Sequence, residues 1–132
     1  MASVREQSLA DAPIIAIVDD DASVRRSLAR VLRAAGYATE TFTSAREFLA
    51  WLPDGQAACL VLDVHLDGIS GFELQKRLAV PVLFITGHDD AMTRARLETS
   101  GAGHLKKPFD EDALLSAVRQ AVRRADGSAS GS

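Results

Sequence analysis

Acidic, hydroxyl and basic side chains follow four of the apolar segments in this sequence. Asp19 and Asp20 come directly after one apolar run, Asp63 ends a second, Thr86 ends a third, and Lys107 follows a fourth. Any one of these residues alone has an ordinary explanation, since an Asp or Thr after a strand is commonly a helix cap. If the four segments are parallel strands, however, all of their carboxyl ends lie at one edge of a sheet, where α/β proteins bind ligands. Together these residues therefore indicate a ligand-binding site at that edge.

The residue types favour phosphate chemistry with a divalent cation. Neighbouring carboxylates repel one another unless a cation lies between them, and Mg²⁺ accepts one or two carboxylates while leaving room for phosphate oxygens. The sequence contains neither a His/Cys cluster for zinc nor a glycine-rich phosphate loop. We expect Asp19 and Asp20 to hold the metal, Lys107 and Thr86 to contact phosphate, and Asp63 to be the nucleophile that accepts a phosphoryl group.

Short β-branched apolar runs alternate with segments of helical periodicity along most of the chain. This alternation predicts an α/β fold with a parallel sheet and helices on both faces, because parallel neighbours need crossover connections. Ser44 and Glu47 have the spacing of a capping box, and Gly36 and Gly101 follow predicted helix ends. The predicted strands cover residues 14–18, 37–43, 59–62, 82–86 and 103–105, and the predicted helices cover about 22–35, 45–52, 72–78, 90–99 and 111–124.

Composition limits the class of protein. A chain of 132 residues that is 47% hydrophobic has the size of one compact domain, and a net charge of −3 with dispersed basic residues does not suggest a nucleic-acid surface. The sequence has no signal-peptide core and nothing near the ~20 apolar residues of a membrane span, so we expect a cytoplasmic protein. The single cysteine, Cys59, should be a buried hydrophobe.

Residues 1–12 are expected to form a flexible leader, 13–124 the domain, and 125–132 a Gly/Ser-rich tail or linker start.

Residues 13–124 resemble the response-regulator receiver domains of two-component signalling. Each shared motif is short, but their order on alternating strands and helices is specific. The resemblance implies a (βα)5 flavodoxin-like, CheY-like fold with a parallel five-stranded sheet in the order 2-1-3-4-5 and helices on both faces. The segments VDDDASVRRSLARVL and FITGH are similar to segments of receivers that precede helix-turn-helix domains. The motifs are Val18-Asp19-Asp20, Leu62-Asp63 with Gly71 eight residues on, Ile85-Thr86-Gly87 and Lys107-Pro108-Phe109.

The resemblance implies a phosphoacceptor. A sensor histidine kinase or a histidine phosphotransfer protein would transfer a phosphoryl group to Asp63 with Mg²⁺. Asp20, Asp63 and the backbone carbonyl of His65 would be the metal ligands, and Asp19 would contribute through water. The domain would not be an enzyme beyond its own phosphorylation and dephosphorylation. The Lys107–Pro108 peptide bond is expected to be cis, a state largely confined to proline.

The family also implies a switch and an output surface. Thr86 would shift onto the new phosphate, and His104 would move with it. The signal would appear on the face built by the fourth helix, the fifth strand and the fifth helix, through which a phosphorylated homodimer could form. His65 and His88 hold positions that tune the lifetime of the phosphoryl group in the family. We expect no direct contact with nucleic acid or membrane.

The sequence departs from the family pattern at four places. Leu66-Asp67 replaces the usual Met-Pro, and His104 replaces a Tyr or Phe, which puts the coupling of Thr86 to the output face in doubt. The connection over residues 78–81 is about four residues short, which should truncate the third helix. One residue is missing between residues 101 and 107.

Two other classes of protein are alternatives. A small phosphatase-like hydrolase could use Asp63 as nucleophile, but such enzymes usually need a second acid at the position that His65 occupies. A flavodoxin-like FMN binder would need a Ser/Thr/Gly-rich loop where this chain has three aspartates. Within the receiver interpretation, a stand-alone regulator and the N-terminal domain of a transcriptional regulator both stay open.

Overall fold

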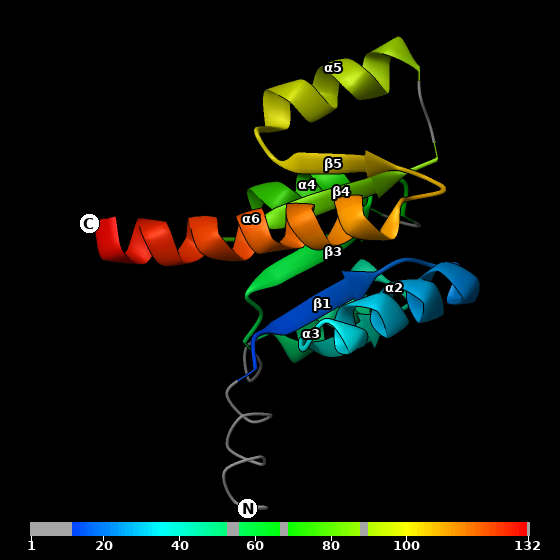
Figure 1. Ribbon diagram of the computed structural model, residues 1–132. Coiled ribbons are helices and arrows are strands. Elements are labelled where there is room, and N and C mark those ends of the chain that lie inside the picture. Colours follow the sequence, from blue (N-terminus) through cyan, green and yellow to red (C-terminus); the bar gives the residue numbers. More distant parts are fainter. Residues whose placement is uncertain (1–11, 53–55, 67–68, 88–89, 132) are drawn as a thin grey trace, which may run out of the picture.

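The computed structural model describes residues 12–131 except for residues 53–55, 67–68 and 88–89, with side chains to residue 124. Five parallel strands form one sheet in the order β2-β1-β3-β4-β5, with helices on both faces (Figure 1). The predicted α/β fold and strand order are therefore confirmed. The strands are β1 (Ile14–Val18), β2 (Ala38–Phe42), β3 (Cys59–Asp63), β4 (Val82–Thr86) and β5 (Gly103–Lys106), and the helices are α2 (Ala22–Ala34), α3 (Ala45–Trp51), α4 (Gly71–Lys76), α5 (Ala91–Ser100) and α6 (Glu111–Gly131).

The three central strands are continuous apolar runs because both of their faces are buried. Every residue of β3 and β4 is buried, and so is β1 after its first residue. Successive side chains along a strand point to opposite faces of the sheet, so the strands supply two separate cores. α2 and α6 complete one core with side chains such as Leu32 and Leu114. α3, α4 and α5 complete the other with side chains such as Phe48, Phe72 and Leu97.

β2 and β5 are the edge strands and carry the exposed polar side chains of the sheet. Glu40 and Thr41 are exposed on β2, and His104 and Lys106 are exposed on β5. The polar composition of residues 37–43 fits the place of β2 at an edge of the sheet. In the buried centre of the sheet, polar side chains occur only where β1, β3 and β4 end, namely at Asp19, Asp63 and Thr86.

Polar side chains fix the starts of the helices, close to where the preceding strands end. Ser44 Oγ accepts the N–H of Glu47 at 3.2 Å, as predicted for a capping box. In return, Glu47 Oε1 accepts the N–H of Thr43 at 2.6 Å, one residue earlier than the usual partner. Such caps satisfy N–H groups that have no partner within the helix. The N-cap side chains are Asp21, Ser44, Ser70, Asp90 and Asp110.

Helix ends differ in part from the prediction. α6 extends to Gly131, whereas the sequence predicted an end near residue 124. Once a helix is nucleated by packing, each further residue adds a hydrogen bond at little cost. The Gly/Ser-rich composition of residues 125–132 therefore did not end α6 where the sequence predicted. α4 has only six residues, as expected from the short connection after it. Gly101 adopts φ 73° and ends α5, as predicted. The expectations for residues 1–11, Asp67 and His88 lie outside the described residues.

Trp51 and Cys59 both have packing roles. The Trp51 ring lies 5.3 Å from the Phe42 ring and 6.1 Å from the Phe48 ring, so it covers the second core from the end of α3. Cys59 is fully buried in β3, and this burial raises the pKa of its thiol to about 12. The thiol therefore stays protonated and unreactive at neutral pH. None of the helices in the described part of the chain is long and apolar enough to cross a membrane.

We predict that Gly71→Ala destabilises the fold and displaces the loop after β3. A Cβ at residue 71 would lie 2.7 Å from the backbone oxygen of Asp63 and 3.2 Å from Cε1 of Phe84, so one of them must move. We expect a loss of roughly 1–3 kcal/mol in the free energy of unfolding, measured by urea denaturation. Gly87→Ala is the matched control, since its Cβ would meet Lys107 Cδ at 3.9 Å, an ordinary contact. Equal unfolding midpoints for the two variants would contradict the prediction.

Candidate functional site

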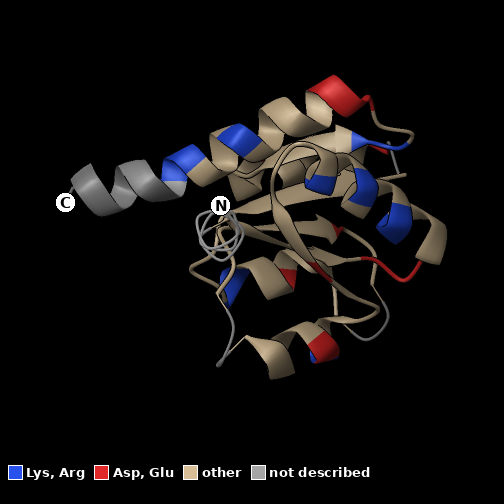
Figure 2. Cartoon of the chain, turned by 60° about the horizontal axis from the view of Figure 1, so that its bottom comes forward, with Lys and Arg blue, Asp and Glu red and all other residues tan. Residues whose placement is uncertain are grey.

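The parallel strands deliver the predicted residues to one edge of the sheet. Asp19 follows β1, Asp63 ends β3, Thr86 ends β4 and Lys107 follows β5. Figure 2 shows acidic residues in red along the turn that leads from β1 into α2. The candidate site thus lies where ligands bind in sheets of this type.

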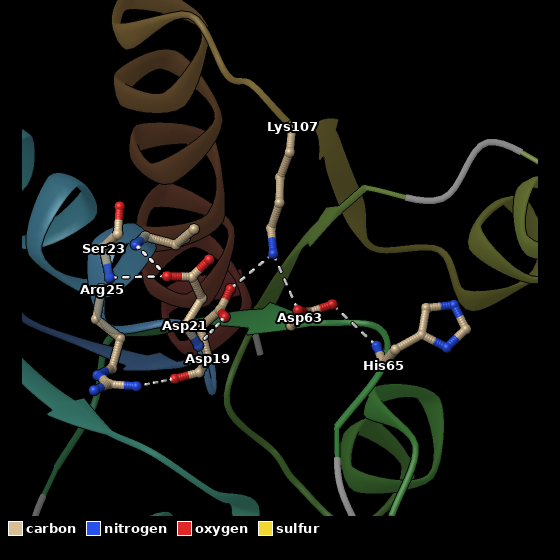
Figure 3. Close-up of polar contacts among 8 residues, drawn as sticks. Asp19, Asp21, Ser23, Arg25, Asp63, His65 and Lys107 are labelled. Carbon is tan, nitrogen blue, oxygen red and sulfur yellow. Dashed lines mark hydrogen bonds and ion pairs between the residues drawn. The ribbon is translucent and has the colours of Figure 1, made fainter.

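Lys107 bridges the two most buried carboxylates of the site. Its Nζ lies 3.0 Å from Oδ2 of Asp19 and 3.1 Å from Oδ2 of Asp63 (Figure 3). Asp19 is only 2% exposed and Asp63 only 8%. Buried carboxylates are costly unless a cation and hydrogen bonds compensate them. The ammonium group therefore stabilises both acids and holds β1, β3 and the segment after β5 together.

The protein keeps this ammonium group charged. Partial burial by itself lowers the pKa of Lys107, but the hydrogen bonds to Asp19 and Asp63 and the charges of the two carboxylates outweigh it, so the pKa lies above the ordinary lysine value. A cation whose pKa is raised by folding stabilises the fold below its unfolded pKa, and this contribution is lost as the pH rises through the raised value. The bridge is thus complete at neutral pH.

Each of the two buried carboxylates uses its second oxygen to accept a backbone hydrogen bond. Oδ1 of Asp19 accepts the N–H of Asp21 at 2.9 Å, and Oδ1 of Asp63 accepts the N–H of His65 at 3.0 Å. These bonds fix the orientation of both carboxylates. The His65 side chain is exposed and turns away from Asp63 (Figure 3), whereas the backbone N–H of His65 contacts the carboxylate.

The acidic residues suit a magnesium ion. In the described part of the chain, carboxylate oxygens of Asp19, Asp20 and Asp63 lie within 4.8 Å of one another. Oxygen donors, several of them carboxylates, match the preference of Mg²⁺, which also retains waters. Asp20 is exposed, so a hydrated ion can approach from that side. The donor set therefore fits the cation that the sequence predicted.

Thr86 lies in the site, whereas His104 lies on the surface. Thr86 is 3% exposed, and its carbonyl accepts the backbone N–H of Lys107 at 2.8 Å. The Lys107–Pro108 bond is cis, as expected from the resemblance. His104 pairs in register with Phe84, two residues before Thr86, and its side chain is exposed on the edge strand. His88 lies outside the described residues.

The sequence analysis did not identify Arg25 as part of the site. Its Nη1 donates a 2.6 Å hydrogen bond to the backbone carbonyl of Asp19. A signal for it was present, since Arg25 lies in the first turn of α2, where the helix dipole disfavours a cation. A basic residue in the first turn of a helix suggests that its side chain binds an acceptor outside that helix.

A family profile covers most of the chain. Residues 15–119 match the family described as the response regulator receiver domain. Nodulation protein W of Bradyrhizobium diazoefficiens is 43% identical over 117 residues, which are 84% of this chain and 52% of that protein. Transcriptional regulatory protein FixJ of the same organism is 37% identical over 121 residues, 87% of this chain and 59% of FixJ. The chain thus spans only about half the length of these curated relatives.

Solved structures show the same fold. The crystal structure of a response regulator receiver protein from Burkholderia phymatum has a TM-score of 0.76 and 43% identity, covering 84% of this chain and 95% of that one. Full-length FixJ from B. japonicum has a TM-score of 0.80 and 36% identity, covering 89% of this chain and 61% of that one.

We predict that Asp20→Asn stabilises the protein in the absence of divalent cations and removes its response to Mg²⁺. Asp20 lies beside two carboxylates that already share the ammonium group of Lys107, so neutralising Asp20 relieves repulsion and should raise the free energy of unfolding by roughly 1 kcal/mol. Thermal unfolding with and without Mg²⁺ measures both effects. Glu40→Gln, an equal charge change on β2, is the control. Equal stabilisation of Asp20→Asn and the wild type by Mg²⁺ would refute the prediction.

Proposed function

This chain belongs to the response regulator receiver domain family, and from that premise we propose that Asp63 is its phosphoacceptor. The observation that carries the proposal is the bridge from Lys107 to Asp63 and Asp19 at the carboxyl edge of the sheet. The bridge holds a carboxylate nucleophile beside a fixed cation, which is the arrangement that phosphoryl transfer needs.

In the proposed reaction, a carboxylate oxygen of Asp63 attacks the phosphorus of a phosphohistidine. The new O–P bond forms as the P–N bond breaks, and the donor imidazole leaves with the electron pair and takes up a proton. Lys107, 3.1 Å from Asp63 Oδ2, would stabilise the charge on the phosphoryl oxygens. Catalysis would be limited to the domain's own phosphorylation and dephosphorylation.

When bound, Mg²⁺ would neutralise part of the negative charge on the phosphoryl oxygens. Asp20, Asp63 and the carbonyl of His65 would hold it, with Asp19 acting through water. Support for this ligand set comes from the carboxylate oxygens within 4.8 Å and from the anchored positions of Asp19 and Asp63.

We further propose that Thr86 moves onto the phosphoryl group and that the surface of α5, β5 and α6 transmits the change. Thr86 lies at the end of β4 beside the site, and β5 carries His104 two positions earlier in register. Because His104 is exposed, its movement would alter the outer surface directly. A homodimer through this surface is part of the proposal.

The identity of the phosphoryl donor and the place of the domain in a longer protein are also proposals. A sensor histidine kinase or histidine phosphotransfer protein would be the donor. The similarity to FixJ, which is named a transcriptional regulatory protein, supports a role as the receiver of a cytoplasmic transcriptional regulator. The chain itself would not contact nucleic acid. A stand-alone regulator is the other form that the proposal allows.

The hydrolase alternative is not favoured. Such an enzyme would place a second acid two residues after Asp63, but that residue is His65, whose ring turns away from the carboxylate (Figure 3). The Asp63 carboxylate is ion-paired with Lys107, and the residue two positions on is not a second acid.

We expect the protein to gain one phosphoryl group when incubated with a small acyl phosphate and Mg²⁺, as seen by intact mass. Asp63→Asn should gain none, because an amide oxygen is a poor nucleophile and loses the charge that pairs with Lys107. Chelation of Mg²⁺ should abolish the adduct in the wild type. Asp21→Asn, which alters a neighbouring acid that caps α2, is the control and should still be modified. An unmodified wild type, or equal modification of Asp63→Asn, would refute Asp63 as the acceptor.

The lifetime of the adduct should depend on His65 and His88. His65 follows Asp63 by two residues and its ring is exposed, so a change of its rotamer would bring the imidazole to the path by which water reaches the adduct. We expect a His65→Ala/His88→Ala variant to lose phosphate at a rate that differs from the wild type by several-fold, followed by intact mass over time. Glu40→Gln, an exposed substitution on the edge strand β2, is the control and should leave the rate unchanged. An unchanged rate in the double variant would contradict the assignment.

A further inference from the structure

Asp20 is the least anchored of the three carboxylates at the proposed metal site. Asp19 and Asp63 each accept hydrogen bonds on both carboxylate oxygens. The Asp20 side chain is exposed and, within the described part of the chain, has no hydrogen-bond or ion-pair partner. Its direction is therefore set by the backbone on either side of it.

The two peptide groups that flank Asp20 are each held by one hydrogen bond. Arg25 Nη1 donates to the carbonyl of Asp19 at 2.6 Å, which fixes the peptide before Asp20. The N–H of Asp21 donates to Oδ1 of Asp19 at 2.9 Å, which fixes the peptide after it. Peptide groups are planar, so these two contacts leave little freedom to the Cα–Cβ direction of Asp20.

Arg25 contacts the turn between β1 and α2 from the side opposite Lys107. Figure 3 shows its guanidinium group beside the Asp19 carbonyl, while Lys107 approaches the Asp19 carboxylate from the other side. The guanidinium is partly buried and has a rigid planar shape, so its hydrogen bond is directional. Its position in the first turn of α2 is unfavourable for the helix dipole, which indicates that the contact with Asp19 offsets a local cost.

We propose that Arg25 is a positioning residue for the magnesium site, acting through the Asp19 carbonyl to aim Asp20 at the metal. Arg25 itself would touch neither the metal nor the phosphoryl group. The inference rests on the proposed function, since it concerns the same Mg²⁺ site.

Positioning and charge have opposite effects on Mg²⁺ affinity, which makes the proposal testable. Arg25 carries a positive charge, so removing that charge alone would strengthen the binding of a cation. Removing a residue that orients a metal ligand weakens binding, commonly by 10–100-fold. The direction of the change in affinity therefore separates the two roles.

The experiment compares Arg25→Met with Arg26→Met by calorimetric titration of Mg²⁺ at constant ionic strength. Arg26 is the adjacent exposed arginine on α2, so its replacement makes the same charge change without the contact to Asp19. We expect the dissociation constant of Arg25→Met to rise about tenfold and that of Arg26→Met to stay unchanged or fall slightly. The rate of phosphorylation by an acyl phosphate should fall in Arg25→Met at low Mg²⁺ and recover at saturating Mg²⁺.

Arg25→Lys provides a second variant that keeps the charge and one donor, and it serves if Arg25→Met does not fold. Its affinity should lie between those of the wild type and Arg25→Met. Unchanged or tighter Mg²⁺ binding by the folded Arg25 variants, beside normal binding by the wild type, would overturn the positioning role and leave the proposed function intact. A wild-type protein that binds no Mg²⁺ would overturn the proposed function and this inference with it.

Discussion

The ammonium group of Lys107 is the contact on which the arrangement of the site depends. It lies between Oδ2 of Asp19 and Oδ2 of Asp63, two carboxylates that are almost fully buried. Without a cation between them, two acids at the ends of neighbouring buried strands would repel each other in a medium of low dielectric constant. The lysine comes from the segment after an edge strand, so this one side chain ties the centre of the sheet to its edge.

The site divides into a rigid part and an open part. Asp19 and Asp63 have both carboxylate oxygens occupied, one by Lys107 and one by a backbone N–H. Asp20 is exposed and depends on the backbone for its direction. Such a division would suit the proposed function, because the proposed nucleophile Asp63 would stay pre-organised while a metal ion enters and leaves on the exposed side. It also leaves more negative than positive charge in the site, a common source of lower stability at functional positions.

Two of the departures from the family pattern lie away from this rigid part. The exposed His104 on β5 and the six-residue α4 both affect surfaces that surround the site rather than the acids themselves. Gly71 is the point where the two regions meet, because its missing side chain lets α4 begin against the Asp63 carbonyl and the Phe84 ring. The start of α4 is therefore tied to the end of β3, where Asp63 lies.

The sequence alone determined the elements, the strand order implied by the resemblance, and the edge at which Asp19, Asp63, Thr86 and Lys107 meet. Apolar periodicity and local motifs indicate the elements and their common edge, because strand ends in a parallel sheet must lie together, whereas the strand order came from the resemblance. It did not reveal the hydrogen bond from Arg25 to Asp19, the extension of α6 to Gly131, or the outward direction of the His65 ring. These depend on side-chain conformations and on packing between distant segments. Local residue patterns do not specify such distances, so only the tertiary structure decided them.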